Sequence, residues 1–204
     1  MSLLYRKIKK DISVEQTIEK SKFIAHIKYV ETREDAEDFI KEIKTLHKDA
    51  THNVPAMVIG DKFQLQWASD DGEPQGTSGA PIAQMLVKEK ISNVVVVVTR
   101  YYGGVKLGTG GLVRAYTSSA KLAINAATLE DVTELASLKY NIEYSILTKF
   151  QSMEGDSIFK IASIEYSDIV QIEFIVALED EAEMRHIVES ISSGRAKEVH
   201  LADF

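Results

Sequence analysis

The stretch from Asn93 to Tyr116, NVVVVVTRYYGGVKLGTGGLVRAY, constrains the fold more than any other part of the sequence. Its five consecutive valines have a strong β preference and no helical period, which predicts a strand buried on both faces. A loop with five glycines between Gly103 and Gly111 follows, and helical spacing begins near Thr109. Together, a buried strand, a glycine loop and a helix start would aim backbone N–H groups at one point, which suits an anion.

The candidate binding residues surround this loop. Cationic side chains and two neighbouring tyrosines flank the glycines, so the segment could hold phosphates and stack on flat groups. It is neither a P-loop, because Thr109 stands where lysine is required, nor a dinucleotide fingerprint. The alternative is a tight crossover that needs small residues for packing alone. The nucleic-acid or phosphate-binding set is Arg100, Tyr101, Tyr102, Gly103, Gly104, Lys106, Gly108, Gly110, Gly111 and Arg114.

Length and composition favour two small domains in a chain of 204 residues. The absence of cysteine excludes a disulfide framework, thiolate metal sites and a cysteine nucleophile. No apolar run approaches the roughly 20 residues that span a bilayer, and the first residues are too charged for a secretory signal. We therefore expect a cytoplasmic protein without a membrane partner.

Charge is unevenly distributed along the chain. Residues 1–128 hold 18 Lys and Arg against 15 Asp and Glu, whereas residues 129–204 hold 6 against 16. This asymmetry supports two domains and leaves the first able to meet an anion. The acidic second half could equally be an ordinary solvated surface. Any nucleic-acid binding would rest on a local patch.

Periodicity predicts the elements of the first half. Thr32, with Asp35 three residues later, indicates a helix start stabilised by a capping box. Residues 69–82 contain too many glycines and prolines for a regular element. The predicted elements are a strand over 22–30, a helix to about residue 46, a hairpin of 55–59 and 63–67, a helix over 81–90, and a long helix from 109 to 127 before a linker at 128–131.

The second half has its own order. The pattern predicts a strand from residue 138 to 144, a helix over 145–153, strands near 159–166 and 169–178, a helix over 179–192 and a last strand over 197–201. This βαββαβ order is that of ferredoxin-like domains. The sequence thus predicts an α+β protein with domains at 1–130 and 131–204.

The acidic turn Asp70-Asp71-Gly72-Glu73, with Thr77 nearby, is a second candidate site. Three carboxylates in four residues could bind Mg²⁺ or Ca²⁺, but the spacing lacks the alternating ligands of an EF-hand. The alternative is a turn whose aspartates accept backbone N–H bonds while Glu73 pairs with Arg100 or Arg114. We expect no metal at this turn.

An enzyme is the rival hypothesis. His52 could act as a base in a pocket shared with Asp71, Glu73 and the glycine loop, on a small phosphorylated or peptidic ligand. Ser78, His52 and Asp70 have the residue types of a catalytic triad, although Gly76–Gly79 does not have the spacing of the G-x-S-x-G nucleophile elbow. No cofactor motif is present, and no cofactor is expected.

Two motifs carry a family resemblance: Asp70–Pro74 with Gly76-Thr77, and Arg100–Gly108 continued by Gly110–Tyr116. By these motifs the chain resembles the IMPACT/YigZ family. The resemblance implies a first domain similar to domain 2 of ribosomal protein S-five and a ferredoxin-like second domain similar to one of elongation factor G. It also implies a link to translation, through nucleic-acid or ribosome binding, and no established enzymatic activity.

Taken together, the sequence predicts a non-enzymatic, translation-associated regulator that binds RNA or a ribosomal or protein surface through the glycine loop. The acidic second domain would recognise a protein partner or a second copy of the chain. If the whole chain were a protein–protein adaptor, we would expect an exposed apolar patch around Tyr140, Tyr144 and Phe174.

Overall fold

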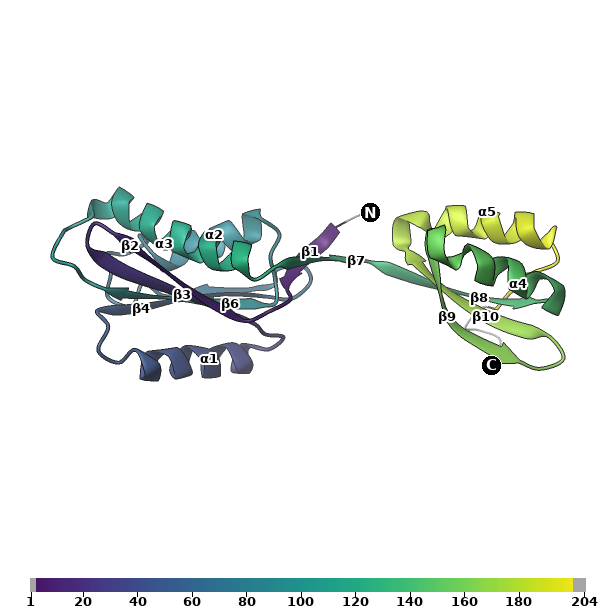
Figure 1. The fold of residues 1–204 in the computed structure, drawn as a ribbon, viewed down its shortest axis with the longest axis horizontal. Coiled ribbons are helices and arrows are strands. Elements are labelled where there is room, and N and C mark those ends of the chain that lie inside the picture. The colour runs from purple at the N-terminus through teal and green to yellow at the C-terminus, as the bar shows by residue number, and fades with distance from the viewer. Residues whose placement is uncertain (1–2, 200–204) are drawn as a thin grey trace. The chain divides into compact units, whose positions relative to one another are not determined.

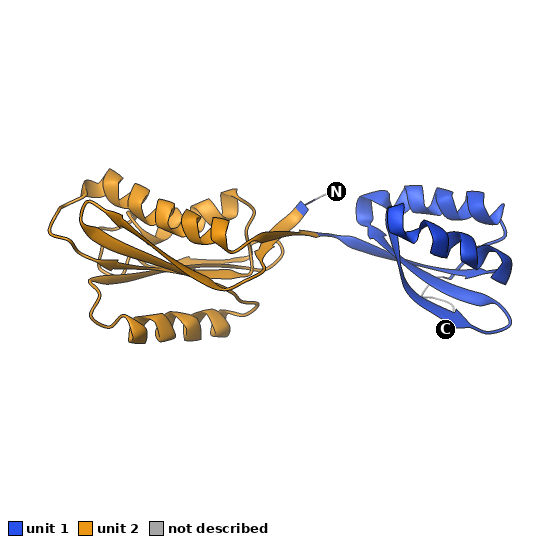
Figure 2. Cartoon of the chain, in the orientation of Figure 1, with its two compact units in different colours: residues 1–3, 133–204 blue, residues 4–132 orange. Residues whose placement is uncertain are grey.

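The computed structural model describes residues 3–199. The chain divides into two compact units. Leu4–Val132 form one, here called the N-terminal unit and drawn orange in Figure 2. Thr133 and the residues after it, with residues 1–3, form the other, here called the C-terminal unit and drawn blue. Each unit has its own hydrophobic core.

The N-terminal unit is built on one antiparallel five-stranded sheet in the order β2-β3-β6-β4-β5. Helices α2 and α3 cover one face of this sheet and α1 covers the other (Figure 1). The elements are β2 (Ile12–Ile18), β3 (Ser21–Tyr29), α1 (Arg33–Leu46), β4 (His52–Ile59), β5 (Leu65–Ala68), α2 (Gly79–Lys88), β6 (Val94–Tyr101) and α3 (Gly108–Ala126).

The valine run forms the central strand, as predicted. Val94, Val96 and Val98 pack into the core beneath α2 and α3, while Val95 and Val97 pack beneath α1. All five valines are fully buried. Because successive side chains of a strand point to opposite faces, one apolar run serves both cores.

Helix α1 begins where the capping box predicts. The backbone N–H of Asp35 donates to Thr32 Oγ1 at 3.1 Å, and the Thr32 hydroxyl donates to the Asp35 carboxylate at 2.6 Å. Ala36, Ile40 and Ile43 are buried against the sheet. Leu46, the last residue of the helix, is 67% exposed.

The predicted linker at residues 128–131 is wrong. Strand β7 (Leu129–Thr133) occupies this position and pairs with β1 (Leu3–Ile8) in a two-stranded sheet. The two strands are more than 100 residues apart in the sequence, so their pairing has no local sequence signal. The strand β2 also went unpredicted, although its exposure alternates along the chain.

The C-terminal unit has the predicted βαββαβ order. Its antiparallel sheet runs β11-β8-β10-β9. Phe150, Phe159 and Phe174 meet in the core with ring centroids 5.0–6.2 Å apart. The elements are β8 (Leu135–Ile142), α4 (Tyr144–Met153), β9 (Phe159–Tyr166), β10 (Val170–Ala177), α5 (Glu181–Ser192) and β11 (Lys197–Glu198); the end of the predicted last strand lies outside the described residues.

The apolar patch expected around Tyr140, Tyr144 and Phe174 does not form. Tyr140 and Phe174 are 5% and 0% exposed in the core, and only Tyr144 is at the surface, 49% exposed. Strand periodicity puts Tyr140 and Phe174 on the face of the sheet that packs against α4 and α5.

Candidate nucleic-acid interface

A buried ion pair joins the two sequence motifs in the N-terminal unit. Arg100 Nη1 donates to Glu73 Oε1 at 2.7 Å, and both side chains are at most 6% exposed. The hydroxyl of Tyr116 donates to the same oxygen at 2.7 Å. Burial and this hydrogen bond raise the pKa of Tyr116 well above its ordinary value, so the phenol stays protonated. Tyr116 and Ser21, which Arg100 Nη2 contacts at 3.3 Å, were not among the predicted site residues.

The guanidinium of Arg100 is also held between two aromatic rings. Its carbon lies 5.4 Å from the ring centroid of Phe23 and 5.3 Å from that of Tyr102. Such cation–π contacts favour a fixed orientation of both partners. Arg100 is therefore neutralised by Glu73 and packed, whereas Tyr102 lies over it with 46% of its surface exposed.

The two predicted stacking tyrosines lie on opposite faces of the sheet. Tyr102 is on the α3 side, over Arg100. Tyr101 is the last residue of β6 and shares a hydrogen bond of 2.9 Å with His47, just after α1. Tyr102 is one residue beyond the end of β6, and its ring contacts Arg100 while that of Tyr101 contacts His47, so the two rings face different surroundings.

Hydrogen bonds to Asp70 hold the acidic turn against the start of α2. Asp70 accepts N–H groups from Gly76, Ser78 and Gly79 at 2.7–3.1 Å and the Ser78 hydroxyl at 2.7 Å. Burial alone would raise the pKa of Asp70, but these hydrogen bonds outweigh it and lower the pKa. Because Ser78 makes no side-chain cap of its own, Asp70 supplies the cap for α2.

The neighbouring residues of the turn also have structural partners. Asp71 accepts the N–H of Asn53 at 2.6 Å and the ammonium of Lys44 at 2.6 Å. The Thr77 hydroxyl donates to the carbonyl of Pro74, and Gly72 has a positive φ of 88°. Across residues 3–199, no group of three or more His, Asp or Glu side chains is arranged to hold a metal ion.

The triad written from the sequence does not assemble. The Ser78 hydroxyl bonds Asp70, while His52 Nδ1 bonds the backbone carbonyl of Asp71 at 2.8 Å. His52 Nε2 lies 3.7 Å from Glu73 Oε1, an oxygen already taken by Arg100 and Tyr116. The site therefore has no serine activated by a histidine.

The glycines of the loop have two different roles. A Cβ on Gly103 would overlap the backbone carbonyl of Lys20, so this glycine permits close packing between β6 and the β2–β3 turn. Gly104 and Gly108 have φ of 86° and 69° and open space around them. Gly110 and Gly111 lie in the first turn of α3.

The start of α3 is open to solvent, and the first turn of the helix has no anionic side chain of its own. Its cap residue, Leu107, makes no side-chain hydrogen bond, and its first turn contains no acidic residue. Gly108 and Lys106 are exposed beside it. A hollow of about 280 Å³, the Tyr102 hollow, runs from Tyr102 and Arg100 to these residues. Its lining includes Glu73 but neither His52 nor Arg114, so the residues of the proposed enzyme pocket do not share it.

Arg114 lies exposed on α3, one turn beyond the glycines. It lines a second hollow of about 500 Å³ with Lys106, Gly111 and the acidic Glu19. Lys106 and Arg114 make no ion pair within the described part of the chain. Of the three predicted cations, two are thus free for an anion and one is buried.

This fold and this site define a two-unit protein of mixed α and β structure, in which a buried Arg–Glu pair supports a basic glycine loop. A family model described as "Impact N-terminal domain" matches residues 19–124. The chain belongs to the IMPACT family.

Individual relatives match most of the chain. It is 41% identical to IMPACT family member YvyE of Bacillus subtilis over 79% of this chain and 75% of that protein. It is 36% identical to IMPACT family member YigZ of Escherichia coli over 78% and 79% of the two chains. A crystal structure of a protein described as hypothetical covers 98% of both chains at 30% identity, with a TM-score of 0.60. Among the described residues, no helix is both long and apolar enough to cross a bilayer.

Proposed function

We propose that this chain is a non-enzymatic, translation-associated regulator that binds RNA or a ribosomal or protein surface through the glycine loop. The observation that carries the proposal is the start of α3, which has no side-chain cap and no acidic residue in its first turn, with Lys106 and Arg114 beside it. Backbone N–H groups of a first helical turn bind phosphate, and the helix dipole favours the negative charge. The exposed ring of Tyr102 adds a platform on which a base can stack.

The proposal divides the predicted residues by role. Lys106, Arg114 and the amides of Gly108–Gly111 would contact phosphates. Arg100 would act only by orienting Tyr102, since Glu73 already balances its charge. Tyr101 belongs to the α1 side and is left out of the contact surface.

The link to translation rests on family membership. Within the same proposal, the first unit is related to domain 2 of ribosomal protein S-five, the second is ferredoxin-like, and the protein works in the cytoplasm. The βαββαβ order and antiparallel sheet support the ferredoxin-like assignment. No catalytic step is proposed, because His52 and Ser78 are engaged with backbone and with Asp70.

Fluorescence anisotropy of labelled single-stranded RNA at several salt concentrations tests the RNA proposal. The variant Lys106→Ala/Arg114→Ala should bind RNA more weakly. The slope of the logarithm of the binding constant against the logarithm of salt concentration should become shallower by about 1.4, because each lost phosphate contact contributes about 0.7. Tyr102→Ala should lose roughly 1–3 kcal/mol of stacking without changing the slope. The matched control Lys41→Ala/Lys48→Ala removes two exposed cations from the α1 side. Absence of binding by the wild-type protein would refute RNA as the ligand.

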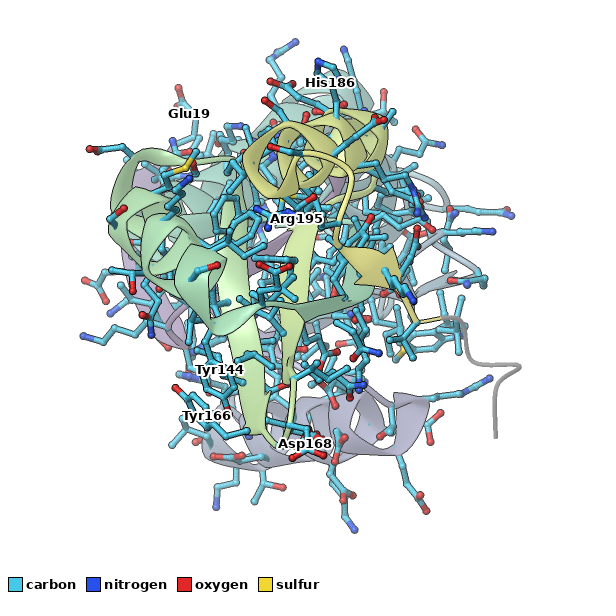
Figure 3. The ribbon with its side chains drawn as sticks, turned by 90° about the vertical axis from the view of Figure 1, so that its right-hand side faces the viewer. Glu19, Tyr144, Tyr166, Asp168, His186 and Arg195 are labelled. Carbon is cyan, nitrogen blue, oxygen red and sulfur yellow. The ribbon has the colours of Figure 1, made fainter. Side chains whose placement is uncertain are left out.

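The C-terminal unit would recognise a protein partner or a second copy of the chain. Tyr144 and Tyr166 stack at the surface with centroids 6.3 Å apart, and Asp168 lies beside them (Figure 3). The Tyr144 hydroxyl donates to the carbonyl of Ser167 at 2.6 Å, which holds its ring in place. Sedimentation analysis of the wild type and Tyr166→Ala tests self-association: a monomer at all concentrations would leave only a different protein as partner.

A further inference from the structure

A groove between α2 and α3 has a charge pattern that the sequence motifs did not indicate. The groove has a volume of about 920 Å³. Its lining holds four cationic side chains, Arg6, Lys88, Arg114 and Lys121, and one acidic side chain, Glu89. Only Arg114 of these belongs to the predicted site.

The acidic residue is already occupied, which leaves the groove positive. The Glu89 carboxylate bonds the ammonium of Lys121, and the Glu89 backbone carbonyl accepts a hydrogen bond from Arg6. Lys88 and Arg114 have no ion-pair partner within residues 3–199. The Nε of Arg6 is buried and has no hydrogen-bond partner. A buried donor without an acceptor costs free energy and is normally satisfied.

The groove continues from the glycine loop. Arg114 and Ser118 line both this groove and the hollow that contains Lys106 and Gly111. Arg114 and Lys121 are seven residues apart, which puts them on one face of α3, about 10 Å apart along its axis. Lys106, Arg114 and Lys121 thus form one basic track from the start of α3 along the helix, and Lys88 of α2 and Arg6 of β1 line the same groove.

We propose that the α2–α3 groove holds the backbone of a single-stranded RNA segment that continues from the glycine loop; this inference rests on the proposed function. The groove is lined by apolar as well as cationic groups, including Met85, Val113 and Pro81. Single-stranded nucleic acid is bound by positively charged grooves that follow its backbone, together with aromatic side chains on which bases stack. The groove would supply the charge along the backbone, and Tyr102 near the glycine loop would supply the aromatic ring.

The test uses the full chain and a short fluorescein-labelled oligouridine. The variant Lys88→Gln/Lys121→Gln removes two groove cations and keeps good helix formers at both positions. We expect the variant to bind the oligouridine about 20-fold more weakly at 0.1 M salt. Its binding constant should also depend less on salt, with a log–log slope shallower by about 1.4, because two phosphate contacts of about 0.7 each are lost. Lys41→Gln/Lys48→Gln, on the α1 side, should match the wild type. Circular dichroism melts check that both variants fold.

Other outcomes separate this inference from the function on which it rests. If Lys106→Ala loses binding while Lys88→Gln/Lys121→Gln keeps wild-type affinity and slope, the glycine loop binds RNA and the groove does not. Equal affinity for a duplex of the same sequence would overturn the single-strand assignment. Equal binding of a polyglutamate peptide of matched charge would make the groove a site for acidic polypeptides instead. If the wild type binds no RNA, both proposals fall.

Discussion

Glu73 and Arg100 form a buried ion pair, with Oε1 and Nη1 2.7 Å apart. This pair joins the acidic turn to the end of the central strand β6. Within residues 3–199, Glu73 has no other cationic partner at such a distance. Arg100 lies between the rings of Phe23 and Tyr102. The pair therefore joins the two sequence motifs at the end of the central strand β6.

Breaking this pair should destabilise the N-terminal unit strongly. Glu73→Gln leaves the guanidinium of Arg100 buried without a counter-charge, which costs about 3–5 kcal/mol. Urea unfolding followed by the fluorescence of Trp67, the single tryptophan, reports on this unit. The control Glu37→Gln breaks the exposed pair with Arg33 and should cost less than about 1 kcal/mol. Equal effects of the two changes would contradict the buried pair.

Stability of the N-terminal unit should fall between pH 6.5 and about 4 because of His26. Burial, and then the nearby His47, lower the pKa of His26 to about 4. The unfolded chain therefore binds the proton first, so stability is complete above pH 6.5 and is lost as pH falls toward 4. The loss should reach about 3 kcal/mol. His26 also shares a 2.7 Å hydrogen bond with Ser13, and Lys22 lies near His47.

Urea titrations at several pH values check this dependence. His26→Gln should reduce the pH dependence, because it removes the histidine whose pKa is lowered to about 4; His47, whose pKa burial also lowers, accounts for the dependence that remains. The exposed His186 provides the control, since His186→Gln should leave the profile unchanged. A wild-type profile that is already flat over this range would contradict the assignment.

The two classes of loop glycine should respond differently to alanine. Gly103→Ala places a Cβ against the backbone carbonyl of Lys20, so β6 or the β2–β3 turn must shift. We expect a loss of at least about 2 kcal/mol. Gly110→Ala meets only the end of the flexible Arg114 side chain at 3.7 Å and gains helix propensity, so it should be neutral or stabilising by up to about 1 kcal/mol. Thermal unfolding of both variants measures the difference.

Asp70→Asn should weaken the cap of α2 without removing a side chain. The two oxygens of the Asp70 carboxylate accept four hydrogen bonds. The asparagine amide has only one oxygen that can accept them. We expect a loss of about 1–2 kcal/mol near neutral pH. Since the pKa of Asp70 is lowered in the folded state, the difference between the wild type and Asp70→Asn should shrink as pH falls through that pKa. A difference independent of pH would contradict the role of the charge.

Local sequence was sufficient for elements whose signal lies in neighbouring residues. The Thr32–Asp35 capping box, the valine run and the βαββαβ order of the second half all depend on short-range periodicity and side-chain-to-backbone hydrogen bonds. The pairing of Glu73 with an arginine was open between Arg100 and Arg114, and only the structure selected Arg100. Both arginines have equal charge, so composition could not separate them.

The sequence by itself determined the motifs, the helices and most of the strands of this protein, because hydrophobic period and caps act over a few residues. The tertiary structure decided which charged side chains are free. Arg100 is buried because Glu73 and Tyr116, distant in the chain, meet it beneath α3. The basic groove exists because α2 and α3 lie side by side on the sheet. The pairing of β1 with β7 likewise joins segments that are more than 100 residues apart in the sequence. Such contacts depend on long-range packing, which no local pattern specifies.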